Sequence, residues 1–303
     1  MTSVVFPGQG SQAEGMAKDF NDNFKISRLI FEEIEDYTQI NIRDIIFNNK
    51  GDKLNLTQFT QICTFSASYV IFKTFISEKG IENKNLNVML GHSLGEYTAL
   101  ACSDKLSLKD CSLILKERGE LMNDAVPPNQ TGMAALIGKN AYEIMKIIDD
   151  NNLNLQIAND NSNIQIVISG SLHDIKNSKE IFLKNNIKKF VILNVSAAFH
   201  SKFMEIAQKK LSDEIDKLRF NKNQIKIISN YDAELSENNL KIKKNLQNQM
   251  ANRVNWTQSI IRLEQYGEKN IIEIGPSKVL SGLIKRISNN FDIISINQIS
   301  DLT

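Results

Sequence analysis

The stretch NVMLGHSLGEYTALA (residues 87–101) runs from an apolar segment through a glycine-rich turn into a helix-forming segment. Within it, Gly91-x-Ser93-x-Gly95 has the form of a nucleophile elbow, a tight turn whose small flanking residues let the backbone approach while the serine projects. The strand-to-helix context favours this function over a structural turn with an ordinary serine. We therefore predict that Ser93 is a nucleophile at a helix N-terminus, where the helix dipole favours negative charge.

The segments on either side of this junction alternate short β-rich runs with longer helical patterns. A strand is expected over residues 3–6 and a long helix over residues 57–78, where apolar side chains recur every three or four positions. Another helix is expected over residues 203–218 and another strand over residues 270–274. Strands separated by helices predict an α/β fold with a parallel sheet flanked by helices.

Residues 125–195 carry a different order of elements, namely strand, helix, strand, strand, helix and a last strand at 189–195. This βαββαβ order is that of a ferredoxin-like unit, and Pro127 and Pro128 mark its entry. We expect a ferredoxin-like subdomain over residues 125–195, inserted into a catalytic core made of residues 1–124 and 196–303.

The overall charge excludes several classes of partner. The chain has 303 residues and 42% hydrophobic composition, and its 36 Lys and Arg against 35 Asp and Glu give a net charge of +1. No global field would recruit nucleic acid or an anionic membrane. With no signal-peptide pattern and no apolar run of membrane-spanning length, a cytoplasmic protein is expected. The three cysteines form no CxxC pair, so neither a metal site nor a disulfide framework is expected.

A nucleophilic serine needs a base, and the chain has only three histidines. His92 adjoins Ser93, so its side chain should point away and pack or orient. His173 opens a predicted helix of the subdomain and is expected at the surface. His200 follows a strand end at the return to the core, where catalytic loops of α/β proteins commonly lie. We predict His200 as the general base; a packed loop histidine is the alternative.

A second glycine-rich turn, FPGQGSQ (residues 6–12), is interpreted as a strand-to-helix turn that aims backbone N–H groups at an anion. Phosphate binding is one possibility, but the spacing is not GxGxxG and no P-loop lysine follows. We favour an oxyanion hole formed by the Gln9 and Leu94 N–H groups. A purely structural turn is the alternative.

Arg118 lies in the middle of an apolar helix face. Burying a guanidinium without an anionic partner is costly, so the pattern predicts either an internal carboxylate, from Glu96 or Glu117, or a carboxylate on the ligand. A bidentate clamp on a substrate carboxylate is the functional form of this prediction.

Together these motifs resemble the malonyl-CoA:acyl carrier protein transacylase family of bacterial fatty-acid synthesis, which includes the acyltransferase domains of polyketide synthases. The resemblance covers nearly the whole chain. It rests on the order and spacing of FPGQGSQ (6–12), GHSLGE (91–96), RG (118–119), NS (161–162), AFHS (198–201), VNW (254–256) and GP (275–276).

The resemblance implies an α/β-hydrolase-like parallel-sheet core with a ferredoxin-like insertion. It also implies that Arg118 pairs with the malonyl carboxylate and that a backbone carbonyl at Gln249 orients the histidine. Phe199 would lie beside the acyl site and crowd a methyl-branched extender unit. By the same resemblance, Ser93 would be the acylated nucleophile and His200 the base. Gln9 and Leu94 would be the oxyanion donors.

The implied reaction is a ping-pong transfer of malonyl from malonyl-CoA to the phosphopantetheine thiol of acyl carrier protein, with no metal or redox cofactor. Acyl carrier proteins are acidic as a family, so a local basic patch is expected at Lys278, Lys285 and Arg286. A monomer is expected. Two alternatives stay open, a serine esterase or thioesterase and a non-catalytic scaffold that binds carrier protein.

Overall fold

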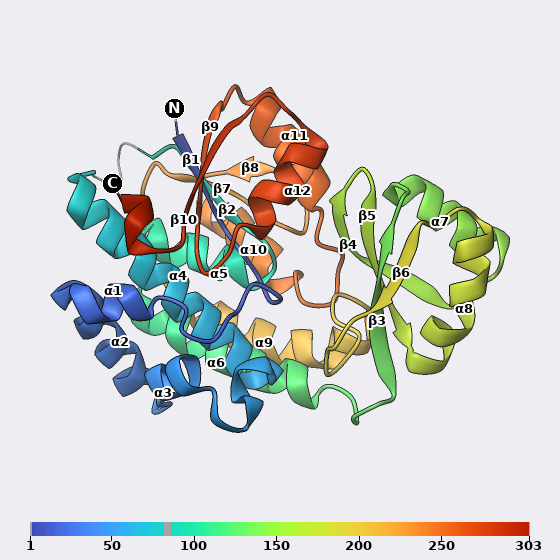
Figure 1. Ribbon diagram of the computed structural model, residues 1–303, viewed down its shortest axis with the longest axis horizontal. Helices are drawn as coiled ribbons and strands as arrows, with labels where there is room; N and C mark the ends of the chain where they lie inside the picture. The colour runs from blue at the N-terminus through green and yellow to red at the C-terminus, as the bar shows by residue number, and fades with distance from the viewer. Residues whose placement is uncertain (1, 82–85, 303) are drawn as a thin grey trace.

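A six-stranded sheet forms the centre of the larger part of the molecule in the computed structural model, which describes residues 2–81 and 86–302 (Figure 1). The strand order is β10-β9-β1-β2-β7-β8, and every pairing is parallel except β7 with β8. The strands are β1 (Thr2–Phe6), β2 (Val88–Gly91), β7 (Lys226–Ile228), β8 (Leu235–Ser236), β9 (Asn270–Ile274) and β10 (Asp292–Ile296). The predicted parallel core is confirmed.

Helices cover both faces of this sheet because successive strand residues point to opposite sides. Val4 and Phe6 pack with the larger helical layer, whereas Val5 packs with α11 and α12. The helices of the core are α1 (Lys18–Asn23), α2 (Lys25–Thr38), α3 (Ile42–Asn48), α4 (Thr57–Lys79), α5 (Leu94–Cys102), α6 (Leu108–Asp124), α9 (Glu205–Lys217), α10 (Asn239–Gln247), α11 (Trp256–Gln265) and α12 (Val279–Ile287). No helix of the described residues is both long and apolar enough to span a membrane.

A separate antiparallel sheet lies beside the core, with two helices on its outer face (Figure 1). Its order is β4-β5-β3-β6, and the predicted βαββαβ sequence of elements is confirmed. Ala134 and Leu136 pack under the helices, while Met133 on the opposite face joins the main core cluster. The elements are β3 (Thr131–Ile137), α7 (Ala141–Asp150), β4 (Leu155–Ser162), β5 (Gln165–Ser171), α8 (Leu172–Lys184) and β6 (Lys189–Ile192).

The last strand of the small sheet is shorter than predicted. β6 ends at Ile192, and the expected continuation to Val195 is wrong. After Leu193, whose N–H still bonds the Met133 carbonyl, the chain leaves the ladder, and Leu193 and Val195 line the cavity beside Ser93. The Val195 N–H bonds the Leu193 carbonyl at 3.1 Å, and this local turn takes the place of further pairing with β3.

One short backbone ladder attaches the small sheet to the core. Val254 accepts from the Asp160 N–H at 3.0 Å and donates to the Ala158 carbonyl at 2.9 Å. β4 is irregular at this point, with register shifts between Ile157 and Asn159 and between Asp160 and Ser162. Residues 249–254 therefore hold β4 in place. The same segment contains Gln249 and Asn252, whose backbone carbonyls face His200.

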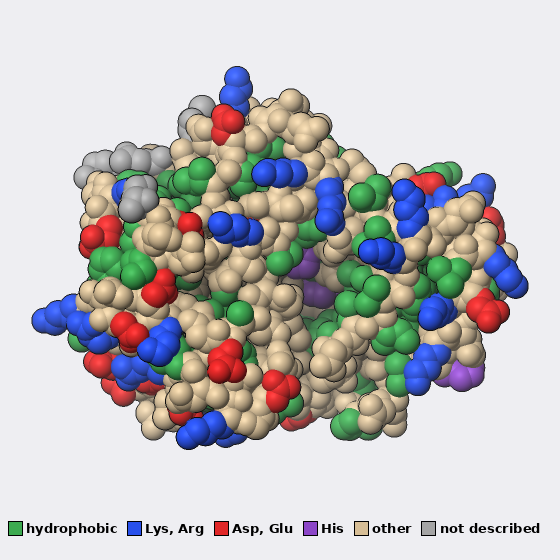
Figure 2. Space-filling model, in the orientation of Figure 1, with side chains coloured by type: hydrophobic (Ala, Val, Ile, Leu, Met, Phe, Trp, Pro, Cys, Tyr) green, Lys and Arg blue, Asp and Glu red, His purple; other side chains and the backbone are tan. Residues whose placement is uncertain are grey.

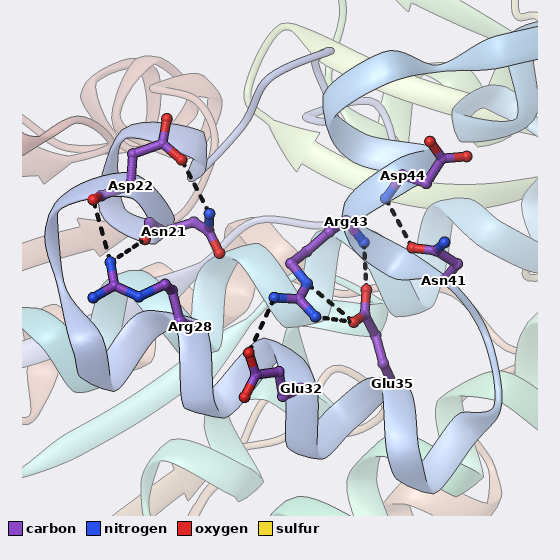
Figure 3. A network of polar contacts seen from close by, with 8 residues as sticks. All are labelled: Asn21, Asp22, Arg28, Glu32, Glu35, Asn41, Arg43 and Asp44. Atoms are coloured by element: carbon purple, nitrogen blue, oxygen red, sulfur yellow. Dashed lines mark hydrogen bonds and ion pairs between the residues drawn. The ribbon is translucent and has the colours of Figure 1, made fainter.

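The N-terminal helices carry a network of polar contacts at the edge of the helical layer (Figure 3). The Arg43 guanidinium bonds both Glu35 and Glu32, and the Arg43 backbone N–H also donates to Glu35. Arg28 donates to the carbonyls of Asn21 and Asp22 and so joins α2 to the end of α1. Each arginine here has its acceptors within the three helices.

Candidate active site

The turn that carries Ser93 is possible only with glycine on both sides. Ser93 has φ 53° and ψ −109° between β2 and α5. A Cβ on Gly91 would lie 2.0 Å from the Gly95 carbonyl carbon, and one on Gly95 would lie 2.2 Å from the Phe6 carbonyl oxygen. Gly91 is therefore required by the tightness of the turn itself, and Gly95 by the close approach of the end of β1.

The structure places His200 against Ser93, although 107 positions separate them in the chain. Ser93 Oγ and His200 Nε2 are 2.8 Å apart. On the other side of the ring, Nδ1 lies 3.1 Å from the carbonyl oxygens of both Gln249 and Asn252. Two carbonyls can only accept, so they select the tautomer with hydrogen on Nδ1 and leave the Nε2 lone pair facing the serine hydroxyl.

The environment of His200 favours a neutral imidazole. Burial, followed by the positive charge of Arg118, lowers the pKa of His200 to about 3. The backbone carbonyls of Gln249 and Asn252 oppose this shift without cancelling it. A histidine that stays neutral at physiological pH can accept a proton from a hydroxyl.

Arg118 is buried beside this pair and contacts no carboxylate. The residue is 1% exposed, and its guanidinium donates to the side-chain oxygens of Gln61 and Gln249 and, at 3.1 Å, to Ser93 Oγ. Among the described residues no carboxylate forms an ion pair with Arg118, and its Nε–H has no acceptor. The guanidinium also lies over the Tyr97 ring, 5.4 Å from its centroid.

Neither carboxylate considered as an internal partner reaches Arg118. Glu117 is exposed on the solvent side of α6. Glu96 is fully buried but accepts from Gln249 and Asn230 instead. Of the two predicted possibilities, the internal ion pair is therefore wrong, which leaves the guanidinium available to a ligand carboxylate.

The turn at residues 6–12 differs from its prediction in one respect. No helix follows it directly, because α1 begins only at Lys18 after a run of turns. Gln9 nevertheless lines the same cavity as Ser93 and His200. Within the part of the chain that the structure describes, the backbone N–H groups of Gln9 and Leu94 have no hydrogen-bond acceptor. Both are thus available to an oxygen bound near Ser93.

The cavity at Ser93 is small and largely apolar. It has a volume of about 90 Å³ and connects the core to the small sheet. Phe199, which is 5% exposed, lines it together with Met122 and Met133. A neighbouring cavity of about 260 Å³ runs past Gln9 and His92 to Leu280 on α12. Figure 2 shows histidine side chains at the bottom of the hollow between the two parts of the molecule.

The other two histidines lie as expected. His92 Nε2 is 2.8 Å from Asn161 Oδ1, and its ring packs against Trp256 with centroids 5.7 Å apart. His92 therefore packs and bonds away from Ser93. The side chain of His173 is 80% exposed at the start of α8.

Several residues at the site were not singled out in the sequence. Gln61 lies on a helix predicted from its apolar periodicity. Its side-chain oxygen accepts from Arg118, and its side-chain Nε2 donates to Met122 Sδ at 3.1 Å. Asn230 Oδ1 accepts from the Ser93 N–H at 2.7 Å. A polar residue within an apolar helix pattern is a signal that could have pointed to Gln61. No local pattern marks Asn230.

The three residues of the expected basic patch are exposed on or beside α12. Lys278 precedes the helix, and Lys285 and Arg286 lie in its last turn. Arg286 also donates to Gln165 of the small sheet at 2.7 Å. α12 contributes Val279, Leu280 and Leu283 to the wall of the cavity of about 260 Å³.

A serine on a strand-to-helix turn, bonded to a neutral histidine at a cavity of an α/β fold, is typical of enzymes that carry acyl groups on serine. Comparison with known proteins gives the family. Residues 4–297 match the model described as acyl transferase domain, and the chain belongs to this family.

Individual relatives are similar over nearly their whole length. Malonyl CoA-acyl carrier protein transacylase of Bacillus subtilis (strain 168) is 34% identical over 299 residues, which cover 97% of this chain and 93% of that protein. An acyl carrier protein S-malonyltransferase from Vibrio cholerae has a TM-score of 0.92 at 32% identity, covering 99% of this chain and 98% of that one. A type II PKS acyl-carrier protein in complex with its malonyl-transacylase matches with a TM-score of 0.93 at 30% identity, covering 99% and 97%. The resemblance and fold class predicted from the motifs are confirmed.

Proposed function

We propose that this protein transfers the malonyl group of malonyl-CoA to the phosphopantetheine thiol of acyl carrier protein, and so supplies extender units for fatty-acid synthesis. The names of its relatives support this activity, as does the solved complex of a related transacylase with a carrier protein. The reaction requires no cofactor, because serine, histidine and backbone donors supply the nucleophile, the base and the charge stabilisation.

One observation carries the malonyl assignment. Arg118 is buried and donates to Ser93 Oγ, and its hydrogen-bond acceptors within the described part of the chain are all neutral. A buried cation without a carboxylate is costly to the fold, and a substrate carboxylate removes that cost. Malonyl carries a carboxylate two bonds from the thioester carbonyl, so an acyl group on Ser93 would bring it to the guanidinium.

In the first half-reaction Ser93 Oγ attacks the thioester carbonyl of malonyl-CoA and its proton passes to His200 Nε2. The carbonyl oxygen becomes negative and accepts from the N–H groups of Gln9 and Leu94. When the carbon–sulfur bond breaks, the proton on His200 goes to the departing CoA thiolate. The product is a malonyl ester on Ser93.

In the second half-reaction the phosphopantetheine thiol gives its proton to His200 and attacks the ester carbonyl. The ester bond breaks, Ser93 takes the proton back, and malonyl leaves on the carrier thiol. Gln249 acts through its backbone carbonyl, which holds the His200 ring, and Phe199 limits the acyl pocket to an unbranched malonyl group. Water placed in the thiol's position would give hydrolysis instead.

Carrier protein would dock on the basic patch of Lys278, Lys285 and Arg286 through its acidic surface. Reversing the three charges should weaken transfer to carrier protein and spare transfer to a small thiol such as N-acetylcysteamine. Equal losses with both acceptors would contradict docking at this patch.

The function is tested by the products. Purified protein is mixed with malonyl-CoA and phosphopantetheinylated acyl carrier protein, and malonyl-carrier protein and free malonate are both quantified. Transfer predicts malonyl-carrier protein in excess over malonate. Malonate alone would identify a thioesterase. If neither product forms, the protein would be a non-catalytic scaffold that binds carrier protein.

A further inference from the structure

A buried carboxylate lies behind the catalytic pair and contacts neither member of it. Glu96, in the first turn of α5, is completely buried. Its Oε2 accepts from Gln249 Nε2 at 2.8 Å and from the Asn230 N–H at 3.0 Å. Burying a carboxylate costs several kcal/mol, and this one has no cationic partner among the described residues. Buried titratable groups without a charged partner are often found at functional sites, so a role of Glu96 in the reaction is expected.

The Gln249 side chain joins Glu96 to Arg118, the residue proposed to bind the malonyl carboxylate. Its Oε1 accepts from Arg118 at 3.0 Å, while its Nε2 donates to Glu96 and to the Ser93 carbonyl at 2.9 Å. The same residue's backbone carbonyl faces His200. One glutamine therefore contacts the elbow, the base and the guanidinium, and Glu96 holds its amide from behind.

An amide has one accepting and one donating end, so its orientation matters. Burial raises the pKa of Glu96 to about 7. Its Oε2 accepts from the Asn230 N–H and so is an acceptor whether or not Oε1 carries a proton. Glu96 therefore directs the NH₂ end of Gln249 toward itself and the Gln249 oxygen toward Arg118. Were the amide released, Arg118 would lose a fixed acceptor that aims it at Ser93. We propose that Glu96 is a positioning residue that sets selectivity for malonyl over neutral acyl groups by fixing the Gln249 amide against Arg118. The inference rests on the proposed function and deepens it.

A purely electrostatic role for Glu96 predicts the opposite sign. The ionised fraction of Glu96 carries a negative charge near the place of the malonyl carboxylate, so removing that charge alone should favour malonyl binding. Positioning depends instead on an acceptor oxygen, which glutamine keeps and methionine lacks. The pair Glu96→Gln and Glu96→Met, which lose the same charge, therefore separates the two roles.

The experiment measures second-order rate constants for acylation of Ser93 by malonyl-CoA and by acetyl-CoA, which has the same leaving group but no acyl carboxylate. The ratio of the two is independent of the fraction of folded enzyme. We expect Glu96→Met to lower the malonyl-to-acetyl ratio about tenfold, and Glu96→Gln to keep it within about threefold of wild type. An equal fall in both variants, or a rise in either, would overturn the proposal.

Two further variants complete the test. Glu273 is another completely buried glutamate, which accepts from the Leu280 and Ser281 N–H groups rather than from Gln249, and Glu273→Met should leave the ratio unchanged. Gln249→Met removes the same link from the other side, so adding Glu96→Met to it should lower the ratio no further. If the single Glu96→Met protein does not fold, a wild-type malonyl-to-acetyl ratio in Gln249→Met would refute the positioning of Arg118 through the Gln249 amide. Failure of the wild type to be malonylated would instead refute the proposed function.

Discussion

Arg43 and Arg118 are both ordered arginines with several acceptors, yet their surroundings are opposite. Arg43 lies at the edge of the N-terminal helices with its side chain 30% exposed, and it pairs with two glutamates (Figure 3). Arg118 is 1% exposed, and its hydrogen-bond acceptors among the residues that the structure describes are glutamine and serine oxygens. The better solvated cation pairs with carboxylates, whereas the buried cation pairs with none in the described ranges 2–81 and 86–302.

The difference distinguishes a cation that stabilises the fold from one that is kept for a ligand. Glu35, through a hydrogen bond to Arg43, raises the pKa of that guanidinium, as expected of a completed ion pair. Arg118 is held in place by neutral acceptors that compensate its charge only in part. Selection for stability alone would favour a carboxylate or an apolar residue there.

The largest expected effect is on malonyl transfer. Arg118→Ala should lower kcat/KM for malonyl-CoA by a factor of at least ~100, because the substrate carboxylate loses its partner. This factor corresponds to a loss of about 3 kcal/mol or more in transition-state stabilisation. Arg43→Ala should stay within about twofold of wild type. Steady-state kinetics with both variants checks this. Retention of malonyl use by Arg118→Ala would favour an esterase and remove the contrast between the two arginines.

The next effect is on the pH dependence. Since burial and then Arg118 lower the pKa of His200 to about 3, the base should stay neutral well below pH 6.5, and acylation by acetyl-CoA should fall only in more acidic solution. Arg118→Ala removes one of these causes, so its acid limb should move to higher pH. Arg43→Ala should not move it. Rate profiles of the three proteins from pH 8 down to about pH 3, with folding checked at each pH, provide the measurement, and a wild-type limb near pH 6.5 would contradict the assigned environment.

A smaller effect is expected from free malonate. At ten times its dissociation constant, a ligand that binds only the folded state stabilises it by about 1.4 kcal/mol. Malonate should therefore raise the unfolding temperature of wild type and of Arg43→Ala, but not that of Arg118→Ala. Acetate, at matched ionic strength, is the control. Equal shifts in all three proteins would show that the anion acts elsewhere.

The smallest effect concerns stability in salt. Arg43→Ala should lower the free energy of unfolding by about 1 kcal/mol at low ionic strength, and by less in 1 M salt, because a partly exposed ion pair is screened. Denaturant titrations at two salt concentrations measure this. A salt-independent loss would mean that Arg43 acts through packing of its aliphatic part rather than through its charge.

Much of the site could be predicted because its chemistry lies in local patterns. The elbow depends on two glycines around one serine, and only three histidines compete for the role of base. Arg118 was visible as a cation within an apolar helix face. The order of strands and helices in the small sheet also follows from local periodicity.

What could not be predicted depends on contacts between distant segments. Gln61 and Asn230 act through hydrogen bonds to residues far away in the chain. The apolar helix pattern around Gln61 marks it only as an unexpected polar residue, and no local pattern marks Asn230. Glu96 was considered as a partner of Arg118, whereas Gln249 lies between the two. The edge strand β10 was also missed, although an apolar run marks it. Subdomain boundaries at 125 and 195 stay a prediction, as do the roles of the site residues.

The central claim is that malonyl is carried on Ser93. The most direct test mixes wild type or Ser93→Ala with malonyl-CoA and then adds phosphopantetheinylated carrier protein. Separate samples are quenched in acid before and after the addition, and the intact masses of both proteins are measured. The account predicts a malonyl-sized adduct on wild type alone, which then moves to the carrier. No adduct on wild type, or an equal adduct on Ser93→Ala, would contradict it.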